Sequence, residues 1–136
     1  MAFIPYDVFH SFDRNRYPRL RQFIGEITTR LAGKLPIRVS APTCVDAVLR
    51  KNGPRTLVHL INRGSGLPNV PSSGAIDEIP PVGPVTVEMD LPEAPNEVSL
   101  AFEEAPLAWE YTPGKRAGRL KIRLERVHIH AAVVVS

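Results

Sequence analysis

From residue 36 onward, apolar and polar side chains alternate along short runs that proline and glycine separate. This alternation constrains the fold strongly, because a period of two is what a β-strand with one buried face requires. Seven such runs are present, at 44–51, 56–63, 85–91, 97–104, 107–111, 119–126 and 127–135. Short strands at this spacing, with turn signals between them, are typical of two antiparallel sheets packed face to face. We therefore predict an immunoglobulin-like antiparallel β-sandwich over residues 36–136.

Residues 1–35 follow a different pattern and are predicted to form a separate segment. Large apolar side chains cluster at the start and predict a buried strand at 2–9. Five apolar residues then recur at helical spacing and predict an amphipathic α-helix at 17–33: Leu20, Phe23, Ile24, Ile27 and Leu31. Gly33 suits the C-cap of this helix. The predicted fold is thus mainly β, with one strand and one amphipathic helix before the sandwich.

The composition indicates the cellular location and excludes some classes of binding partner. The single cysteine, Cys44, excludes an internal disulfide and a four-cysteine zinc site, so a reducing, cytoplasmic location is expected. The longest apolar run, 131–135, is far too short to span a bilayer. The net charge of +3 is small, and no aromatic residues alternate with the arginines of the predicted helix to stack on bases. We therefore expect neither a membrane nor a nucleic acid as a partner.

One connection between the predicted strands is unusually long. Residues 64–84 carry few large apolar side chains and many prolines and glycines. Loops of this length without structure of their own are commonly functional or disordered. We favour partial disorder, and we predict that limited proteolysis first cuts the chain within 64–80.

No catalytic or cofactor motif appears in the sequence. The nucleophile elbow, the HExxH zinc motif, the P-loop and the dinucleotide glycine fingerprint are all missing. Glycosidic chemistry needs two carboxylates held across the scissile bond. The adjacent carboxylates at 77–78 and 103–104 give no sign of that geometry. We therefore predict no catalytic residue, no cofactor and no enzyme activity in this chain.

Two histidines are the main candidates for a metal site. His128 and His130 are two residues apart on a predicted strand, so they share one face of it. They would supply two zinc ligands, with His59 or Cys44 added from a neighbouring strand. A polar strand face is the favoured interpretation, because no spacing in the sequence identifies the remaining ligands. A small metal-dependent enzyme that uses His128 and His130 stays an alternative.

Two aromatic residues are candidates for contact with a sugar. Trp109 and Tyr111 share a strand face and would form a platform against a sugar ring. Leu107 lies on the same face, which favours a position in the core. A carbohydrate-binding module that uses Trp109 and Tyr111 is the first alternative function, ahead of the metal-dependent enzyme.

Three segments resemble a known group of proteins. They are RTLVHLINRGSG (55–66), IDEIPPVGPVTVEMDLP (76–92) and LKIRLERVHIHAAVVVS (120–136). They are similar to the end of large bacterial glycoside hydrolase-like proteins, in which an α-amylase-like barrel is followed by a glutamine-amidotransferase-like domain of the β-galactosidase trimerisation type. A small β-sandwich closes those chains. The opening FIPYDVFHSFDRNRYPRLRQFIGEITTRL (3–31) resembles the last strand and the last helix of the amidotransferase-like domain.

This resemblance implies that the chain corresponds to the carboxy-terminal part of such a protein. It also implies two domains, a strand–helix remnant over 1–35 and the sandwich over 36–136. The catalytic carboxylates of such proteins would lie in the barrel, so none is carried over to this chain. His59, Asn62 and His130 match positions in the strand motifs, which imply architecture rather than chemistry.

The resemblance makes a non-catalytic accessory β-sandwich, with a role in structure or assembly, the leading functional hypothesis. Without the rest of the amidotransferase-like domain, the apolar stripe of the predicted helix is left uncovered, and such a patch favours self-association. We predict a homo-oligomer held through residues 1–35, and association with a hydrolase barrel domain is the other partnership expected. Asp7 is the one acidic residue near a domain end that would face a substrate cleft in a full-length relative.

Overall fold

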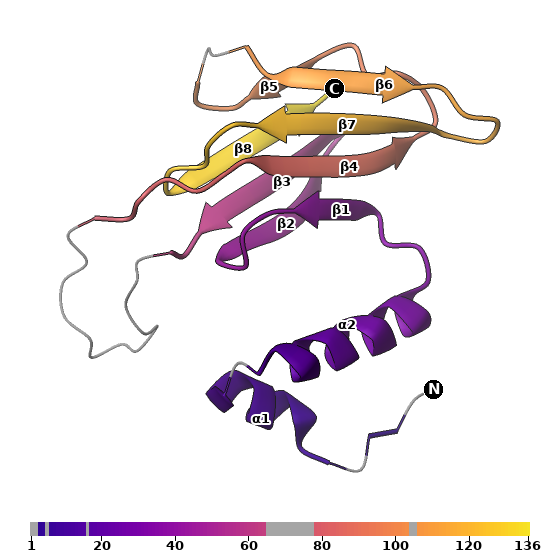
Figure 1. The fold of residues 1–136 in the computed structure, drawn as a ribbon. Helices are drawn as coiled ribbons and strands as arrows, with labels where there is room; N and C mark the ends of the chain where they lie inside the picture. Colours follow the sequence, from indigo (N-terminus) through magenta and orange to yellow (C-terminus); the bar gives the residue numbers. More distant parts are fainter. Residues whose placement is uncertain (1–2, 5, 16, 65–77, 104–105) are drawn as a thin grey trace. The chain divides into compact units, whose positions relative to one another are not determined.

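The computed structural model describes residues 3–4, 6–15, 17–64, 78–103 and 106–136 of the chain. The chain divides into two compact units, Met1–Pro36 and Ile37–Ser136. Figure 1 shows that the first contains the helices and the second the strands. The connection predicted to be cut first by a protease falls mostly on residues 65–77, which lie outside the described residues. None of the helices in the described chain has the length and the apolar character that crossing a bilayer needs.

The first unit contains two helices, α1 (Val8–Asn15) and α2 (Pro18–Ala32). The strand predicted at 2–9 is wrong, because α1 begins inside this stretch and the described residues before it pair with no strand. A lone strand leaves its backbone N–H and C=O groups unpaired, whereas a helix pairs them internally. Asp7 caps α1, since its Oδ1 accepts a hydrogen bond from the His10 N–H at 3.2 Å. Asp7 therefore has a local structural role.

The helix α2 matches the helix predicted at 17–33. Pro18 occupies its first turn, where a missing N–H costs nothing. Gly33 is the C-cap residue with a φ of 65°, a conformation that favours glycine, and its N–H donates to the Thr29 carbonyl at 3.1 Å. No residue of α2 is buried. Leu31 on the apolar stripe is 58% exposed, so the amphipathic face lacks a complete cover.

The second unit is a sandwich of two four-stranded antiparallel sheets, as predicted. One sheet, called sheet A here, has the strand order β1 (Ile37–Ser40), β4 (Val85–Leu91), β7 (Gly118–Leu124) and β6 (Ala108–Thr112). The other, called sheet B, has the order β2 (Val45–Asn52), β3 (Arg55–Asn62), β8 (His130–Val135) and β5 (Val98–Leu100). All neighbouring strands in both sheets run antiparallel. Figure 1 shows the strands of both sheets.

The core lies between the inner faces of the two sheets. The strand β7 shows how the sequence builds it, because buried and exposed residues alternate along its whole length. Leu120 and Ile122 are fully buried, whereas Lys121, which lies between them, and Arg119, which precedes them, are exposed. The other large side chains that are fully buried are also aliphatic: Leu60, Val58, Val85, Val87, Val127 and Val133. Burying each such side chain stabilises the fold by roughly 1.5–3 kcal/mol relative to exposing it.

Three strands depart most from the prediction. The strand β1 was not predicted, because its alternation extends over only four residues; it pairs with β4 at the edge of sheet A. The strand β5 ends at Leu100 rather than 104, and Phe102, which lies beyond its end, is 81% exposed. The strand β8 begins at His130 rather than 127, because Val127 instead forms an isolated bridge with Val82.

Asn62, the one buried polar residue among the described residues, is only 2% exposed. Its Nδ2 donates hydrogen bonds to the carbonyls of His128 and Pro80 at 2.7 and 2.9 Å. Its Oδ1 accepts a hydrogen bond from the Gly64 N–H at 2.9 Å, and its own N–H donates to the Ile129 carbonyl at 2.9 Å. A single residue thus ties the end of β3 to the segments that lead into β4 and β8.

Candidate functional site

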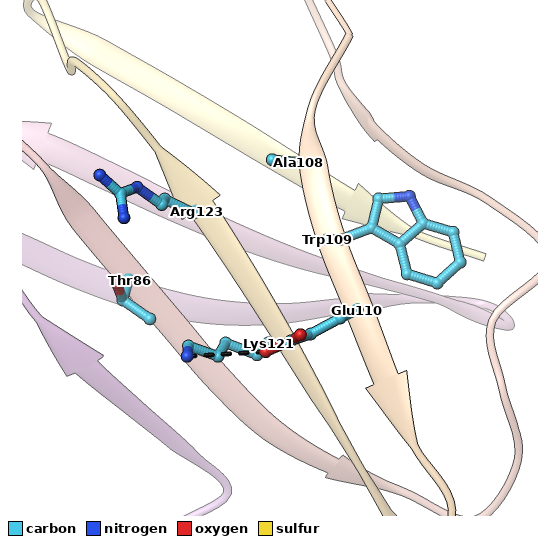
Figure 2. Close-up of a pocket in the computed structure, with 6 residues that line it drawn as sticks. All are labelled: Thr86, Ala108, Trp109, Glu110, Lys121 and Arg123. Carbon is cyan, nitrogen blue, oxygen red and sulfur yellow. Dashed lines mark ion pairs between the residues drawn. The ribbon is translucent and has the colours of Figure 1, made fainter.

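Opposite charges alternate across the outer face of sheet A, the face turned away from the core. Arg38 lies opposite Glu88, which lies opposite Lys121. Lys121 lies in turn opposite Glu110, and its Nζ is 3.6 Å from Glu110 Oε1, an ion pair visible in Figure 2. Cross-strand pairs of opposite charge contribute roughly 0.2–1 kcal/mol each to a sheet. These side chains therefore neutralise one another across the face.

A depression of about 310 Å³ lies among the side chains of this face. Its lining combines a hydroxyl, two cations and a carboxylate with two apolar residues: Thr86, Ala108, Trp109, Glu110, Lys121 and Arg123. Figure 2 shows the Trp109 ring projecting away from Arg123 and Lys121. Arg123 Nε pairs with Glu125 Oε1 at 2.8 Å. The depression can hydrogen-bond a small polar ligand, but its lining offers one carboxylate where glycosidic chemistry needs two.

Trp109 and Tyr111 lie on the edge strand β6 with different exposure. They lie opposite Ile122 and Leu120, so both side chains point to the core side of sheet A. Tyr111 is half-buried against the core, and its hydroxyl donates to the Leu91 carbonyl at 3.4 Å. Trp109 is 40% exposed, since no further strand covers the outer edge of β6 in sheet A. Of the two rings, Trp109 therefore offers the accessible surface, and its contact with a sugar stays a prediction.

His59 and His130 come together on the outer face of sheet B. His59 Nδ1 is 3.0 Å from His130 Nε2. The register of β3 and β8 places His59 opposite Ala132 and His130 opposite Ile61, so the two histidines are diagonal neighbours on one face. The sequence named His59 as a residue that a neighbouring strand would add to His130, and the structure brings these two side chains together.

His128 and Cys44 take no part in this pair. The prediction that His128 and His130 share a strand face is wrong, because residues 128–129 form a bend and β8 begins only at His130. Cys44 is a half-buried free thiol just before β2. Within the described part of the chain, no group of three His, Cys, Asp or Glu side chains is arranged to hold a metal ion.

Asn62 is a buried polar residue that belongs to no chemical motif of the sequence. Its hydrogen bonds all go to backbone groups of its own sandwich. The sequence signal was a polar residue at an inward position of an otherwise apolar strand, because Asn62 follows Leu60 with a period of two. Such a residue needs satisfied hydrogen bonds in the core, so Asn62 organises the fold and is not free to bind a ligand.

Comparison with known proteins gives a match to a structure but none to a family. No family model matches the chain, and no curated protein matches it. Among the solved structures that match, one shares the fold of almost the whole chain. It is alpha-L-fucosidase isoenzyme 2 from Paenibacillus thiaminolyticus. The TM-score is 0.76 at 19% sequence identity, and the match covers 98% of this chain.

The same match covers only 20% of the fucosidase chain. This chain therefore spans about one fifth of the length of that enzyme. At 19% identity the likeness shows a common fold. The likeness extends to the fold alone and covers only this part of the fucosidase chain.

Proposed function

We propose that this chain is a non-catalytic accessory β-sandwich of a glycoside hydrolase-like protein, with a role in structure and assembly. The match of 98% of the chain to 20% of the fucosidase chain carries the proposal. Residues 37–136 have the size and the separate hydrophobic core of an independent domain, which suits an accessory domain of a larger enzyme. The depression on sheet A supports a non-catalytic role, because its one carboxylate, Glu110, pairs with Lys121.

The helical unit is the proposed assembly surface, as a remnant of an amidotransferase-like domain. Seven of the eleven large apolar or aromatic side chains that the described chain exposes lie within residues 3–35. They are Phe3, Tyr6, Phe9, Tyr17, Phe23, Leu31 and Leu35. Exposed apolar clusters of this kind mark protein–protein contacts. The occupant that we propose is a second copy of the same unit, which would give a homo-oligomer.

A hydrolase assay tests the non-catalytic role. We expect the purified chain to release no 4-nitrophenol from 4-nitrophenyl α-L-fucoside, or from the matching galactoside and glucoside, above the rate of a buffer blank. The physical reason is the missing second carboxylate in the depression. The Glu110→Gln variant is the matched control. Turnover by the native chain that this substitution abolishes would overturn the proposal.

A carbohydrate-binding module is the second candidate function, and the exposure of Trp109 is the observation that favours it. Trp109 is the single tryptophan of the chain, so intrinsic fluorescence reports on this side chain alone. If the chain is a purely structural domain, fucose-containing oligosaccharides should leave the emission maximum unmoved. A saturable shift of the emission maximum on adding the oligosaccharide would instead indicate sugar binding at Trp109. The same shift should then occur in the Glu110→Gln and Tyr111→Phe variants.

A further inference from the structure

The histidine pair on sheet B has the geometry of two facing ring nitrogens. The planes of His59 and His130 differ by 13° and their centroids are 5.2 Å apart, while His59 Nδ1 and His130 Nε2 are only 3.0 Å apart. The distance between the centroids exceeds the distance between the nitrogens by about twice the distance from a ring centroid to its nitrogen. The two nitrogens therefore lie close to the line that joins the centroids. The rings are therefore nearly coplanar and meet end to end, although parallel planes alone would also suit a face-to-face stack.

Two neutral imidazoles in this position share one hydrogen atom. Each neutral ring has one N–H donor and one lone pair, so the ring nitrogen of one histidine donates to that of the other. If both rings instead carry their hydrogen on the far nitrogen, His59 on Nε2 and His130 on Nδ1, two lone pairs face each other. A metal ion then replaces the shared hydrogen atom, and neither ring has to ionise. The change is a shift between neutral tautomers.

The separation of the two nitrogens already suits a metal. Bonds of about 2.0–2.1 Å from a divalent ion to two imidazole nitrogens, at an angle of about 90–110°, put those nitrogens roughly 2.9–3.4 Å apart. The observed distance is 3.0 Å. A rotation of each ring about its Cβ–Cγ bond, a soft torsion, would aim both lone pairs at one point.

The surroundings allow an ion to enter and select its class. His130 is exposed and His59 half-buried, so the ion reaches the nitrogens from solvent. Phe102, whose ring centroid is 6.3 Å from that of His130, lies on one side of the pair. Among the residues that the structure describes, no carboxylate joins the two histidines as a third metal ligand. Two imidazoles suit copper, nickel and zinc rather than magnesium or calcium. Water molecules would complete the coordination.

We propose that His59 and His130 form a two-nitrogen binding site for a divalent transition metal, with Cu²⁺ bound most tightly. Affinity for imidazole ligands rises from Co²⁺ through Ni²⁺ to Cu²⁺ and falls again at Zn²⁺. The bound ion links β3 to β8, whose two histidines are 71 residues apart in the sequence. Because the unfolded chain lacks this pair, the ion stabilises the folded sandwich.

Titration of the full chain with Cu²⁺ tests the proposal. Calorimetry should give one tight Cu²⁺ per chain, and the electron paramagnetic resonance spectrum should show two coordinated nitrogens. Removing a side chain that only hydrogen-bonds to a metal ligand typically weakens metal affinity by about 10–100-fold, and removing the ligand itself should weaken it at least as much. His59→Gln and His130→Gln should each weaken Cu²⁺ binding by at least that factor. Cu²⁺ should raise the melting temperature of the native chain but not that of these two variants.

The other two histidines provide matched controls. His10→Gln and His128→Gln leave the pair intact and should bind Cu²⁺ as the native chain does. The amino terminus is present in every variant, so any Cu²⁺ that it binds cancels in the comparison. Melting curves without metal check that each variant folds, and His130→Ala replaces the glutamine variant if that fails. Cu²⁺ binding that survives both pair substitutions, or that His128→Gln removes, would overturn the proposal.

Discussion

Substitution of Asn62 should destabilise the sandwich more than any other single change to a polar side chain in the described sheets. In Asn62→Ala, the carbonyls of His128 and Pro80 and the N–H of Gly64 lose their partner. Each buried polar group left without a hydrogen bond costs about 1–3 kcal/mol, and some of these groups will recover water. We expect a loss of about 2–4 kcal/mol in the free energy of unfolding, which lowers the melting temperature by roughly 10–20 °C.

The Asn62→Asp variant should lose still more stability. Its carboxylate has the shape of the amide but has no N–H to donate, so oxygen would face the carbonyls of His128 and Pro80 at the 2.7 and 2.9 Å contacts. The residue is 2% exposed, so water cannot solvate the charge. Urea unfolding measures the effect, with Asn96→Asp on the exposed surface as the control. Melting of Asn62→Asp within about 2 °C of the native chain would show that Asn62 is not a structural clamp.

Removal of residues 1–35 should abolish self-association and leave the sandwich folded. The core contains residues of the second unit only, so residues 36–136 should retain a cooperative melt. The intact chain should be a dimer or larger in light scattering, because the exposed apolar side chains of the helical unit need a cover. A monomeric intact chain at micromolar concentration would contradict the prediction, and an oligomer that survives the deletion would move the interface to the sandwich.

Charge gives this prediction a second, independent readout. Residues 1–36 contain six basic and three acidic residues, whereas residues 37–136 contain eleven of each. Self-association of the helical unit therefore brings like charges together, and raising the salt concentration should strengthen it. Binding to an acidic partner would instead weaken with salt. Leu31→Glu on the apolar stripe should abolish the association, whereas Arg30→Glu beside it should not.

The sequence predicted correctly those helices and strands in which the local pattern of apolar and polar residues matches the pattern of burial. In β7 the apolar residues Leu120 and Ile122 are buried and the polar Lys121 between them is exposed, so the sequence alternation predicted the strand correctly. The helix α2 was predicted for the same reason, with Gly33 supplying the positive φ that ends it. The strand wrongly expected at 2–9 had the right apolar content. The strand prediction was wrong because it did not consider Asp7 as a helix N-cap. The Asp7 side chain accepts a hydrogen bond from a backbone N–H of the first turn and so stabilises the helix.

The candidate sites depended on facts that no short stretch contains. Trp109 and Tyr111 were correctly placed on one strand face, but only the tertiary structure shows that Tyr111 packs against the core while Trp109 is 40% exposed. The strand predicted at 97–104 ends at Leu100, so Phe102 lies beyond it and is exposed. The partner of His130 followed from the β3–β8 register, and a slip of one residue would have put His59 on the opposite face.

The sequence by itself determined that this chain is a β-sandwich preceded by an amphipathic helix, because the periods of two and 3.6 are set by neighbouring residues and by the geometry of the backbone. It also determined which side chains, such as Leu120 and Ile122, form the core. Only the tertiary structure decided that Asn62 clamps three segments and that His59 faces His130. Those contacts join residues 18 to 71 positions apart, and they form only once burial of the apolar faces has fixed the order and register of the strands.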